Sequence, residues 1–201
     1  MSPLGRVGGV VLAGGRSRRF GTDKLVAPYG DVPLLHRPIA ALSGLCEEIL
    51  VIQAADAQDL PLPPEPVVVR IVRDATLDQG PLAGTVSGLS HTEAPAALVV
   101  AGDMPELSVP VLRTMVRTLN EPGVDAVWLD DGNRPRPFPL ALRVAPALAA
   151  AQRLLEEGER RMRALPAALG ARVLPLEIWS ALDPRRRTLH DVDLPRDLPL
   201  E

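Results

Sequence analysis

The segment from Val10 to Leu25, VVLAGGRSRRFGTDKL, gathers the residue types that bind phosphate groups. Its glycines, Gly14, Gly15 and Gly21, let the backbone turn sharply and present N–H groups to an anion. Its arginines offer forked donors, and the Lys24 ammonium adds a compact positive charge. Amide donors, guanidinium forks and a point charge together predict a loop that wraps a chain of phosphates.

Lys24 is the only lysine in the chain, whereas 21 residues are arginine. A compositional preference for arginine would replace lysine wherever the two are interchangeable. They are not interchangeable where a compact, mobile ammonium is needed instead of a planar fork. The position of Lys24 beside the glycine loop therefore favours a specific chemical role. The alternative reading is that one lysine remains by chance.

Asp103 is the carboxylate best placed to hold a cation. It follows the apolar run AALVVAG and precedes Pro105. A carboxylate at the end of a buried strand contributes little to packing, but it can hold a hard cation through oxygen. The alternative is that Asp103 caps the helix expected to begin near Ser108.

The composition limits the class of protein. The chain has 201 residues, with 46% hydrophobic but only 2% aromatic residues, so its core must be built from aliphatic side chains. A net charge of −3 and the scarcity of aromatic residues argue against nucleic-acid and membrane binding. Cys46 is the only cysteine, so we expect no internal disulfide, no zinc cluster and a reducing, cytoplasmic location.

The N-terminal stretch gives no sign of targeting. Arg6 followed by VGGVVLAGG loosely resembles a short secretory leader, but glycines interrupt it and no small-residue cleavage site follows. No apolar stretch approaches the length of a membrane span. We therefore expect neither a leader nor a membrane segment.

The order of apolar segments predicts strands alternating with helices. Strands are expected at 8–12, 49–54, 67–72, 96–103 and 171–178, and helices at 32–48, 81–93, 108–121, 144–158 and, broken near Pro166, 159–170. Short apolar runs at 125–130 and 138–143 flank an expected loop at 131–137. This pattern is typical of an α/β fold with a largely parallel sheet. Ligands of such sheets bind beyond the carboxyl ends of the strands, where the glycine loop and Asp103 would meet.

The spacing of the glycine loop excludes two common phosphate motifs. In the Walker A pattern glycine directly precedes lysine, whereas Thr22 and Asp23 intervene here, and the pattern G-x-G-x-x-G is absent. The spacing L-A-G-G-x-S-x-R-x-G-x-D-K instead resembles the signature loop of single-domain nucleotidyltransferases. Within that group it most resembles the molybdenum cofactor guanylyltransferases, the MobA family. Further segments match in order along the chain: RDATLDQGPLAG, LVVAGDMPEL, GERRMRALPAAL and HDVDLPRDL.

The resemblance implies a single domain over residues 1–201, with a three-layer, Rossmann-like nucleotidyltransferase fold and a mostly parallel, mixed sheet. The nucleotide-binding half would span about 1–107 and the acceptor-binding half about 108–201. The catalytic residues would be Lys24 and Arg19 on the phosphates and Asp103. Mg²⁺ would be held by Asp103 and Asp193, with Asp191 as a less certain ligand. The nucleotide would be bound by Leu12, Ala13, Gly14, Gly15, Lys24, Gln53, Asp74, Gly80 and Asp103.

The reaction implied by the resemblance is attack of the acceptor's terminal phosphate on the α-phosphorus of GTP, with release of pyrophosphate. The acceptor would be molybdopterin or the molybdenum cofactor, and proteins that deliver or receive the cofactor would be partners. The basic segment 133–143 could close over a phosphorylated acceptor, or it could serve solubility. No Ser–His or Cys–His pairing suggests a protein nucleophile.

Departures from the family pattern keep other functions open. Gln53 stands where the family commonly has asparagine, and Asp191 and Asp193 stand where it tends to have two asparagines. Simple turn-forming roles are the alternatives for Asp74, Asp191 and Asp193. A cytidylyltransferase acting on the same pterin, a sugar-phosphate nucleotidylyltransferase and a non-catalytic nucleotide-binding module are the competing functions.

Overall fold

The computed structural model describes residues 5–14, 24–64, 68–74 and 80–199. A seven-stranded sheet runs through the molecule in the order β5-β4-β1-β6-β8-β7-β9. Its strands are β1 (Val7–Leu12), β4 (Glu48–Ala54), β5 (Val68–Asp74), β6 (Ala96–Ala101), β7 (Ala126–Asp130), β8 (Pro135–Arg143) and β9 (Arg172–Leu174). A small separate hairpin joins β2 (Pro28–Tyr29) to β3 (Val32–Pro33). Strands from both halves of the sequence therefore build one sheet.

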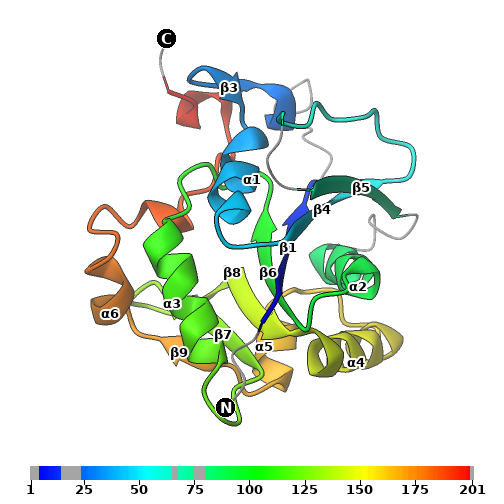
Figure 1. Ribbon diagram of the computed structural model, residues 1–201, viewed down its shortest axis with the longest axis vertical. Helices are drawn as coiled ribbons and strands as arrows, with labels where there is room; N and C mark the ends of the chain where they lie inside the picture. The colour runs from blue at the N-terminus through cyan, green and yellow to red at the C-terminus, as the bar shows by residue number, and fades with distance from the viewer. Residues whose placement is uncertain (1–4, 15–23, 65–67, 75–79, 200–201) are drawn as a thin grey trace.

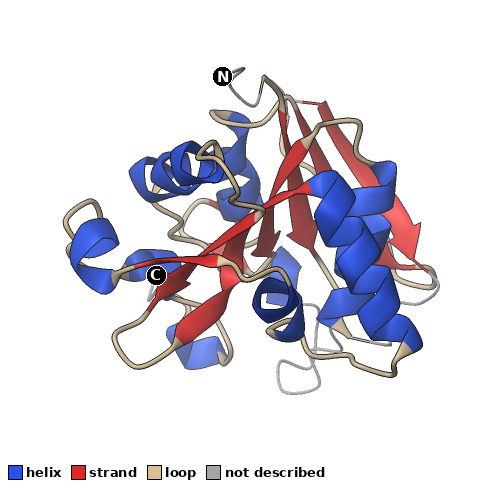
Figure 2. Ribbon diagram, turned by 90° about the horizontal axis from the view of Figure 1, so that it is seen from below, coloured by secondary structure: helices blue, strands red, loops and turns tan. Residues whose placement is uncertain are grey.

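Helices cover both faces of this sheet (Figure 1). On one face lie α1, α3 and α6, and on the other lie α2, α4 and α5. The view in Figure 2 shows the sheet passing between these two sets of helices. The helices are α1 (His36–Ser43), α2 (Pro81–His91), α3 (Val109–Leu119), α4 (Val144–Glu156), α5 (Ala164–Ala168) and α6 (Leu176–Ser180), with 3₁₀ turns η1 (Lys24–Val26), η3 (Arg187–Leu189) and η4 (Pro195–Asp197).

The alternation of side chains along each strand divides the core into two layers. On β1, Val11 packs with the α1 and α3 side, whereas Val10 and Leu12 pack with the α2 and α4 side. All six residues of β1 are buried, because the strand lies in the middle of the sheet. This confirms the expected three-layer α/β fold built from aliphatic residues.

The sheet is mixed because one strand runs backwards. β1 pairs in parallel with β4 and β6, and β4 with β5, but β8 pairs antiparallel with both β6 and β7. The start of β8 therefore lies at the same edge as the carboxyl ends of β1, β4, β5, β6 and β7. This edge receives Ala13 and Gly14 after β1, the turn after β6 and the turn between β7 and β8.

Four expected elements are wrong in extent. β8 begins at Pro135, within the loop expected at 131–137, and three other elements differ as follows. The helix expected at 32–48 is shortened to α1, because Val32 and Pro33 pair with the preceding strand as β3. The helix expected at 159–170 begins only at Ala164. The strand expected at 171–178 ends at Leu174, because Pro175 lacks an N–H donor, and α6 follows.

The late start of α5 has a local cause. The Glu159 carboxylate accepts hydrogen bonds from the backbone N–H groups of Arg160 and Arg161 and from the Arg161 guanidinium. The Arg161 side-chain bond, followed by these backbone bonds, lowers the pKa of Glu159 to about 2. A turn stabilised in this way competes with helix formation over the same residues.

Two further observations bear on the sequence expectations. Cys46 is buried, and burial raises the pKa of its thiol to about 12, so it stays protonated at neutral pH and does not act as a nucleophile. In the described part of the chain, no helix is long and apolar enough to cross a membrane.

Close packing of α2 on β1 gives a test of the fold. In a Gly88→Ala variant the new methyl group would overlap the side chain of Val10. Overpacking costs about 1–3 kcal/mol, while alanine gains only about 1 kcal/mol of helix propensity over glycine. We expect urea unfolding to show a net loss of unfolding free energy of up to about 2 kcal/mol.

The matched control is Gly44→Ala at the end of α1. No atom lies within 4 Å of the added methyl group, and the backbone φ of −81° suits alanine. This variant should unfold at the same urea concentration as the wild type or higher. Equal stability of the Gly88→Ala variant would show that α2 does not pack this closely on β1.

Candidate active site at the carboxyl edge of the sheet

The end of β1 is tied to both of its neighbours. The Ala13 N–H donates to the Ile52 carbonyl oxygen at 2.9 Å, and the Gly102 N–H donates to the Leu12 carbonyl oxygen at 3.0 Å. Leu12 and Ala13 are buried, whereas Gly14 is exposed at the sheet edge. The backbone thus leaves the core at Gly14. Gly15 and Arg19, which the sequence assigns to the site, lie outside the described residues.

Lys24 is held by groups from two distant parts of the chain. Its Nζ donates to Asp103 Oδ2 at 2.6 Å and to the Val192 carbonyl oxygen at 2.9 Å, and it lies 3.9 Å from Asp193 Oδ1. The Lys24 and Asp103 side chains are only 18% and 20% exposed, so water screens their ion pair less than it would a surface pair. The tertiary structure therefore brings together Lys24, Asp103 and Asp193, three residues that the sequence assigns to one site.

A C-terminal segment is fastened against the turn after β6. The Val192 N–H donates to the Asp103 carbonyl oxygen at 2.9 Å, and Val192 is fully buried. Upstream, Asp183 accepts from both the N–H and the hydroxyl of Thr188, each at 2.7 Å. The Ser108 N–H donates to the same Thr188 hydroxyl. These bonds fix the position of the two acidic residues on either side of Val192.

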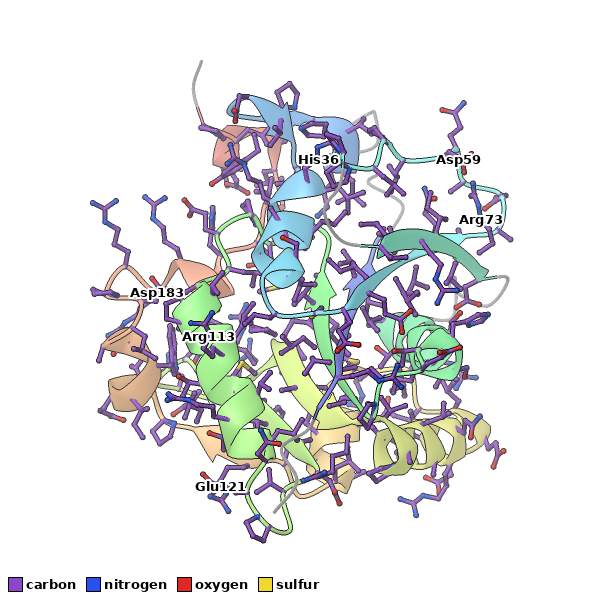
Figure 3. All side chains as sticks on the ribbon, in the orientation of Figure 1. His36, Asp59, Arg73, Arg113, Glu121 and Asp183 are labelled. Atoms are coloured by element: carbon purple, nitrogen blue, oxygen red, sulfur yellow. The ribbon has the colours of Figure 1, made fainter. Side chains whose placement is uncertain are left out.

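Ser108 occupies the N-cap position of α3, as the sequence predicts, but its hydroxyl does not cap the helix. It contacts the Leu182 carbonyl oxygen instead, at 3.5 Å. Asp103 does not cap α3 either, since its described partners are Lys24 and Val192. Figure 3 labels Asp183 beside the start of α3, where this junction forms.

A second basic residue approaches the acidic cluster from β8. Arg136 lies 3.8 Å from Asp191 Oδ1 and 3.5 Å from Asp131 Oδ2. Burial raises the pKa of Asp191, and the charges of Asp193 and Asp103 raise it further. The N–H groups of residues 134 and 133 hold the pKa of Asp131 below its usual range, with a smaller contribution from Arg136. Sequence analysis placed Arg136 only within a basic segment of uncertain role.

The nucleotide-side residues lie at the ends of β4, β5 and the start of α2. Gln53 is fully buried, and its Nε2 donates to the Gln58 carbonyl oxygen at 2.6 Å. Its Oε1 is buried with no hydrogen-bond partner among the described residues. Asp74 is buried at the end of β5. Arg73 fixes the adjoining turn, since it donates to the Ala54 carbonyl oxygen and pairs with Asp59 (Figure 3).

Gly80 has a conformational reason to be glycine. It occupies the N-cap position of α2 with φ 102°, which L side chains rarely adopt, and a Cβ would meet the Arg160 carbonyl oxygen at 3.2 Å. The segment with the sequence GERR thus packs against the start of α2. Two segments that the sequence placed in different halves of the protein therefore meet beside Gly80.

The three histidines are spread over the described structure. His36 contacts the Pro61 carbonyl oxygen, His91 contacts the Ser87 carbonyl oxygen, and His190 lies 3.4 Å from Glu106. Figure 3 shows His36 at the start of α1. Among the described residues, no three His, Cys, Asp or Glu side chains gather as a metal site. Asp103 and Asp193 share the Lys24 ammonium instead.

Sequence reasoning missed a cavity next to the Lys24 centre. It has a volume of about 470 Å³ and lies between the β2–β3 hairpin and the C-terminal segment. Glu106 follows Asp103 by three residues, and its carboxylate pairs with Arg187. The described lining comprises Tyr29, Glu106, Arg185, Arg186, Arg187, His190, Asp197, Leu198 and Pro199. The run of three arginines was the signal in the sequence.

The chemistry of the site is that of charged oxygen groups and cations. An ammonium and a guanidinium flank three carboxylates at the edge where the glycine segment leaves β1. Such an arrangement can bind phosphate oxygens through the cations and a hard metal ion through the carboxylates. The described residues of this centre include no serine, cysteine or histidine nucleophile paired with a base.

Known proteins match the whole of this architecture. Residues 9–173 match the model of the MobA-like NTP transferase domain. A probable molybdenum cofactor guanylyltransferase of Chloroflexus aggregans is 36% identical, with 96% of this chain and 91% of that protein aligned. A probable molybdenum cofactor guanylyltransferase of Mycobacterium avium is 38% identical, with 96% and 93% aligned.

Solved structures match the fold at lower identity. The molybdopterin-guanine dinucleotide biosynthesis protein A of Archaeoglobus fulgidus has a TM-score of 0.74 at 20% identity, covering 95% of this chain and 94% of that one. A 2-C-methyl-D-erythritol 4-phosphate cytidylyltransferase of Thermus thermophilus has a TM-score of 0.65 at 18% identity, covering 94% of each chain. The matched domain, spanning most of the sequence, and the full-length relatives lead to one conclusion: this chain is a nucleotidyltransferase and belongs to the MobA-like NTP transferase family.

Proposed function

We propose that this enzyme transfers GMP from GTP to the phosphate of molybdopterin or the molybdenum cofactor, and so makes the guanine dinucleotide form of the cofactor. The observation that carries the proposal is the contact of Lys24 Nζ with Asp103 and Val192 at the edge where the glycine segment leaves β1. Relatives named as probable molybdenum cofactor guanylyltransferases at 36–38% identity over nearly the whole chain support this choice of substrates.

The residues on the nucleotide side fit a guanine base. Guanine presents two neighbouring donors, its N1–H and its 2-amino group. Gln53 offers a buried Oε1 acceptor that has no hydrogen-bond partner among the described residues, and the Asp74 carboxylate is buried at the end of the adjacent strand β5. Gln53 pairs with Arg73, and Ala54 pairs with Asp74, so Gln53 and Asp74 lie one register step apart at the ends of adjacent strands, where side chains alternate between the two faces. A buried acceptor without a donor is costly, and a guanine N–H would remove that cost.

The reaction is an in-line displacement at the α-phosphorus. An oxygen of the acceptor phosphate forms a bond to the α-phosphorus of GTP. The bond between the α-phosphorus and the oxygen that bridges it to the β-phosphorus breaks. Pyrophosphate leaves with the electron pair of the broken bond. The Lys24 ammonium, turned from Asp103 toward the phosphates, would stabilise the negative charge that develops. No protein nucleophile takes part in this scheme.

Asp103 and Asp193 would hold Mg²⁺. Their carboxylate oxygens are the hard ligands that Mg²⁺ prefers, and in this structure both lie next to the positively charged Lys24 nitrogen. The same oxygens can therefore accommodate a cation between them. When bound there, the metal would neutralise phosphate charge in the transition state. Asp191 would lie just outside this pair of ligands.

The setting of the reaction follows from the nature of the acceptor. We place the enzyme in the cytoplasm, where its single cysteine would remain reduced. A labile cofactor is best passed directly between proteins, so partners that deliver the acceptor or receive the product are part of the proposal.

Pyrophosphate release tests the function directly. Purified enzyme, Mg²⁺ and purified molybdopterin cofactor are incubated with GTP, CTP, ATP or UTP in separate reactions. We expect release with GTP alone. Release with CTP alone would retain the mechanism and reject the guanine assignment. Absence of release with every nucleotide, from folded protein and verified cofactor, would reject this acceptor.

The geometry around Lys24 predicts that arginine cannot replace it. The ammonium fits between a carboxylate at 2.6 Å and a carbonyl oxygen at 2.9 Å, whereas a guanidinium is larger and planar. We expect Lys24→Arg to lower the rate of pyrophosphate release by at least about 100-fold, the range found when one preorganised transition-state donor is lost.

A conservative swap elsewhere serves as the control. Arg70 pairs with Glu48 at the amino end of the sheet, and Arg70→Lys should leave the rate unchanged. Near wild-type activity of the Lys24→Arg variant would contradict the proposed role of the ammonium.

Lys24 also competes with a metal for Asp103 in the nucleotide-free protein. Lys24→Met removes the competing charge, so we expect Mn²⁺, used as a paramagnetic probe, to bind the nucleotide-free variant more tightly than the wild type. Asp103→Asn should weaken Mn²⁺ binding instead. Electron paramagnetic resonance of free Mn²⁺ measures both changes, and weaker binding to the Lys24→Met variant would show that these carboxylates are not the metal site.

A further inference from the structure

Arg136 lies beside the acidic residues of the site, and the nucleotide-binding scheme above assigns it no role. It lies at the start of β8, which runs antiparallel to β6. Each step forward along β6 is one step back along β8, and Val99 pairs with Leu140. The pairing of β6 with β8 ends at this pair, and the earlier residues of β8, Arg136 among them, extend toward the edge where Asp103 follows β6. The reversed direction of β8 therefore puts Arg136 at the same edge of the sheet as the carboxylate that contacts Lys24.

A bulge in β8 sets where Arg136 stands relative to β7. Trp128 of β7 pairs with Leu140, but the next residue, Leu129, pairs with Arg136. Residues 137–139 of β8 are thus passed over in the register with β7. Bulges of this kind redirect side chains and are common beside active sites. Here the bulge brings Arg136 to the sheet edge that also carries Asp191.

The Arg136 guanidinium is held loosely and retains donors. Its described contacts are to Asp131 at 3.5 Å and to Asp191 at 3.8 Å, both longer than a typical charge-assisted hydrogen bond. Asp131 already accepts bonds from the N–H groups of residues 133 and 134 at 2.9 and 3.0 Å. The side chain is 31% exposed, so a ligand can reach it. A guanidinium with five N–H donors and two long contacts can accept a closer anionic partner.

The order of the strands indicates which substrate supplies the anionic partner of Arg136. The glycine segment leaves β1, which lies on one side of β6, whereas β8 lies on the other side. In an in-line displacement the attacking oxygen stands opposite the leaving pyrophosphate across the α-phosphorus. If the glycine loop and Lys24 hold the nucleotide phosphates on the β1 side, the acceptor must approach over β8.

We propose that Arg136 binds the phosphate monoester of the acceptor through its forked N–H donors and aligns it for attack. This inference rests on the proposed function and names the acceptor-side residue of the same site. Arg136 exchanges its long contact with Asp191 for the acceptor phosphate, whose planar O–P–O edge matches the guanidinium fork. It makes no contact with the nucleotide, so its removal weakens binding of the acceptor and leaves binding of GTP intact.

The test is a steady-state comparison of Arg136→Gln and Arg136→Lys with the wild-type enzyme. Pyrophosphate release is measured with the acceptor varied at saturating GTP, and then with GTP varied at saturating acceptor. We expect Arg136→Gln to raise the KM for the acceptor by about 10- to 100-fold, as loss of a charge-assisted hydrogen bond does. The KM for GTP should remain within about twofold, and Arg136→Lys should recover part of the loss because it restores the charge without the fork.

Arg134→Gln is the matched control. Arg134 is exposed in the same turn, two residues before Arg136, and no ion pair of its side chain is described. This variant should match the wild type in both KM values. An equal effect of both substitutions would indicate long-range attraction by positive charge and would overturn the specific role of Arg136.

A structural role for Arg136 makes a different prediction. If Arg136 only positions Asp191, Arg136→Gln should lower kcat or thermal stability and leave the KM for the acceptor unchanged, which would overturn the proposal. Failure of the proposed function is distinguished beforehand, because the wild-type enzyme would then release no pyrophosphate with GTP and this acceptor. Direct titration of the acceptor, followed by pterin fluorescence in the absence of nucleotide, gives a second readout that should weaken in parallel with KM.

Discussion

The ion pair between Lys24 and Asp103 joins the parts of the molecule on which the site depends. The two residues are 79 positions apart, and the Val192 carbonyl oxygen that completes the contact lies 168 positions from Lys24. Lys24 begins η1, Asp103 follows β6, and Val192 lies between η3 and η4. The Lys24 ammonium is mostly buried, so water cannot fully solvate its charge and protein groups must do so instead. The contact therefore requires β1, β6 and the C-terminal segment to meet at the same edge.

A group of charged side chains extends from this ion pair across the sheet edge. Lys24 and Arg136 stand at the two ends, and Asp103, Asp193 and Asp191 lie between them. Burial raises the pKa of Asp191, and the charges of Asp193 and Asp103 raise it further. Carboxylates gathered in this way are suited to share a cation, whereas the two basic groups remain suited to phosphate oxygens. The grouping of these three carboxylates therefore fits the proposed chemistry of the site.

Because β8 runs in the reverse direction, residues at the start of a strand also reach the functional edge of the sheet. Because β8 runs against β6, its first residues, and not its last, lie at the functional edge. The parallel part of the sheet supplies the glycine segment, Gln53 and Asp74, while β8 supplies Arg136. The two sides of the site therefore come from the two halves of the sequence, and a single sheet holds them in register.

The sequence by itself determined the fold class and named most of the residues that we propose for the site. Aliphatic runs marked β1, β4, β5 and β6, since a buried parallel strand needs apolar residues on both faces. The glycine loop, the solitary Lys24 and the strand-ending Asp103 pointed to phosphate and metal chemistry through residue type and spacing. The resemblance to a known family added Gln53, Asp74 and Asp193.

Only the tertiary structure decided how these residues meet. The Val192 carbonyl contact has no signature in the sequence, because every residue has such a group. Arg136 could not be separated from its basic neighbours until the bulge and the antiparallel register placed it beside Asp191. Local competition likewise fixed the ends of elements: the hydrogen bonds of Glu159 delayed α5, and pairing of Val32 shortened α1. Composition and spacing reveal which groups are available, but contacts between distant segments depend on packing and register.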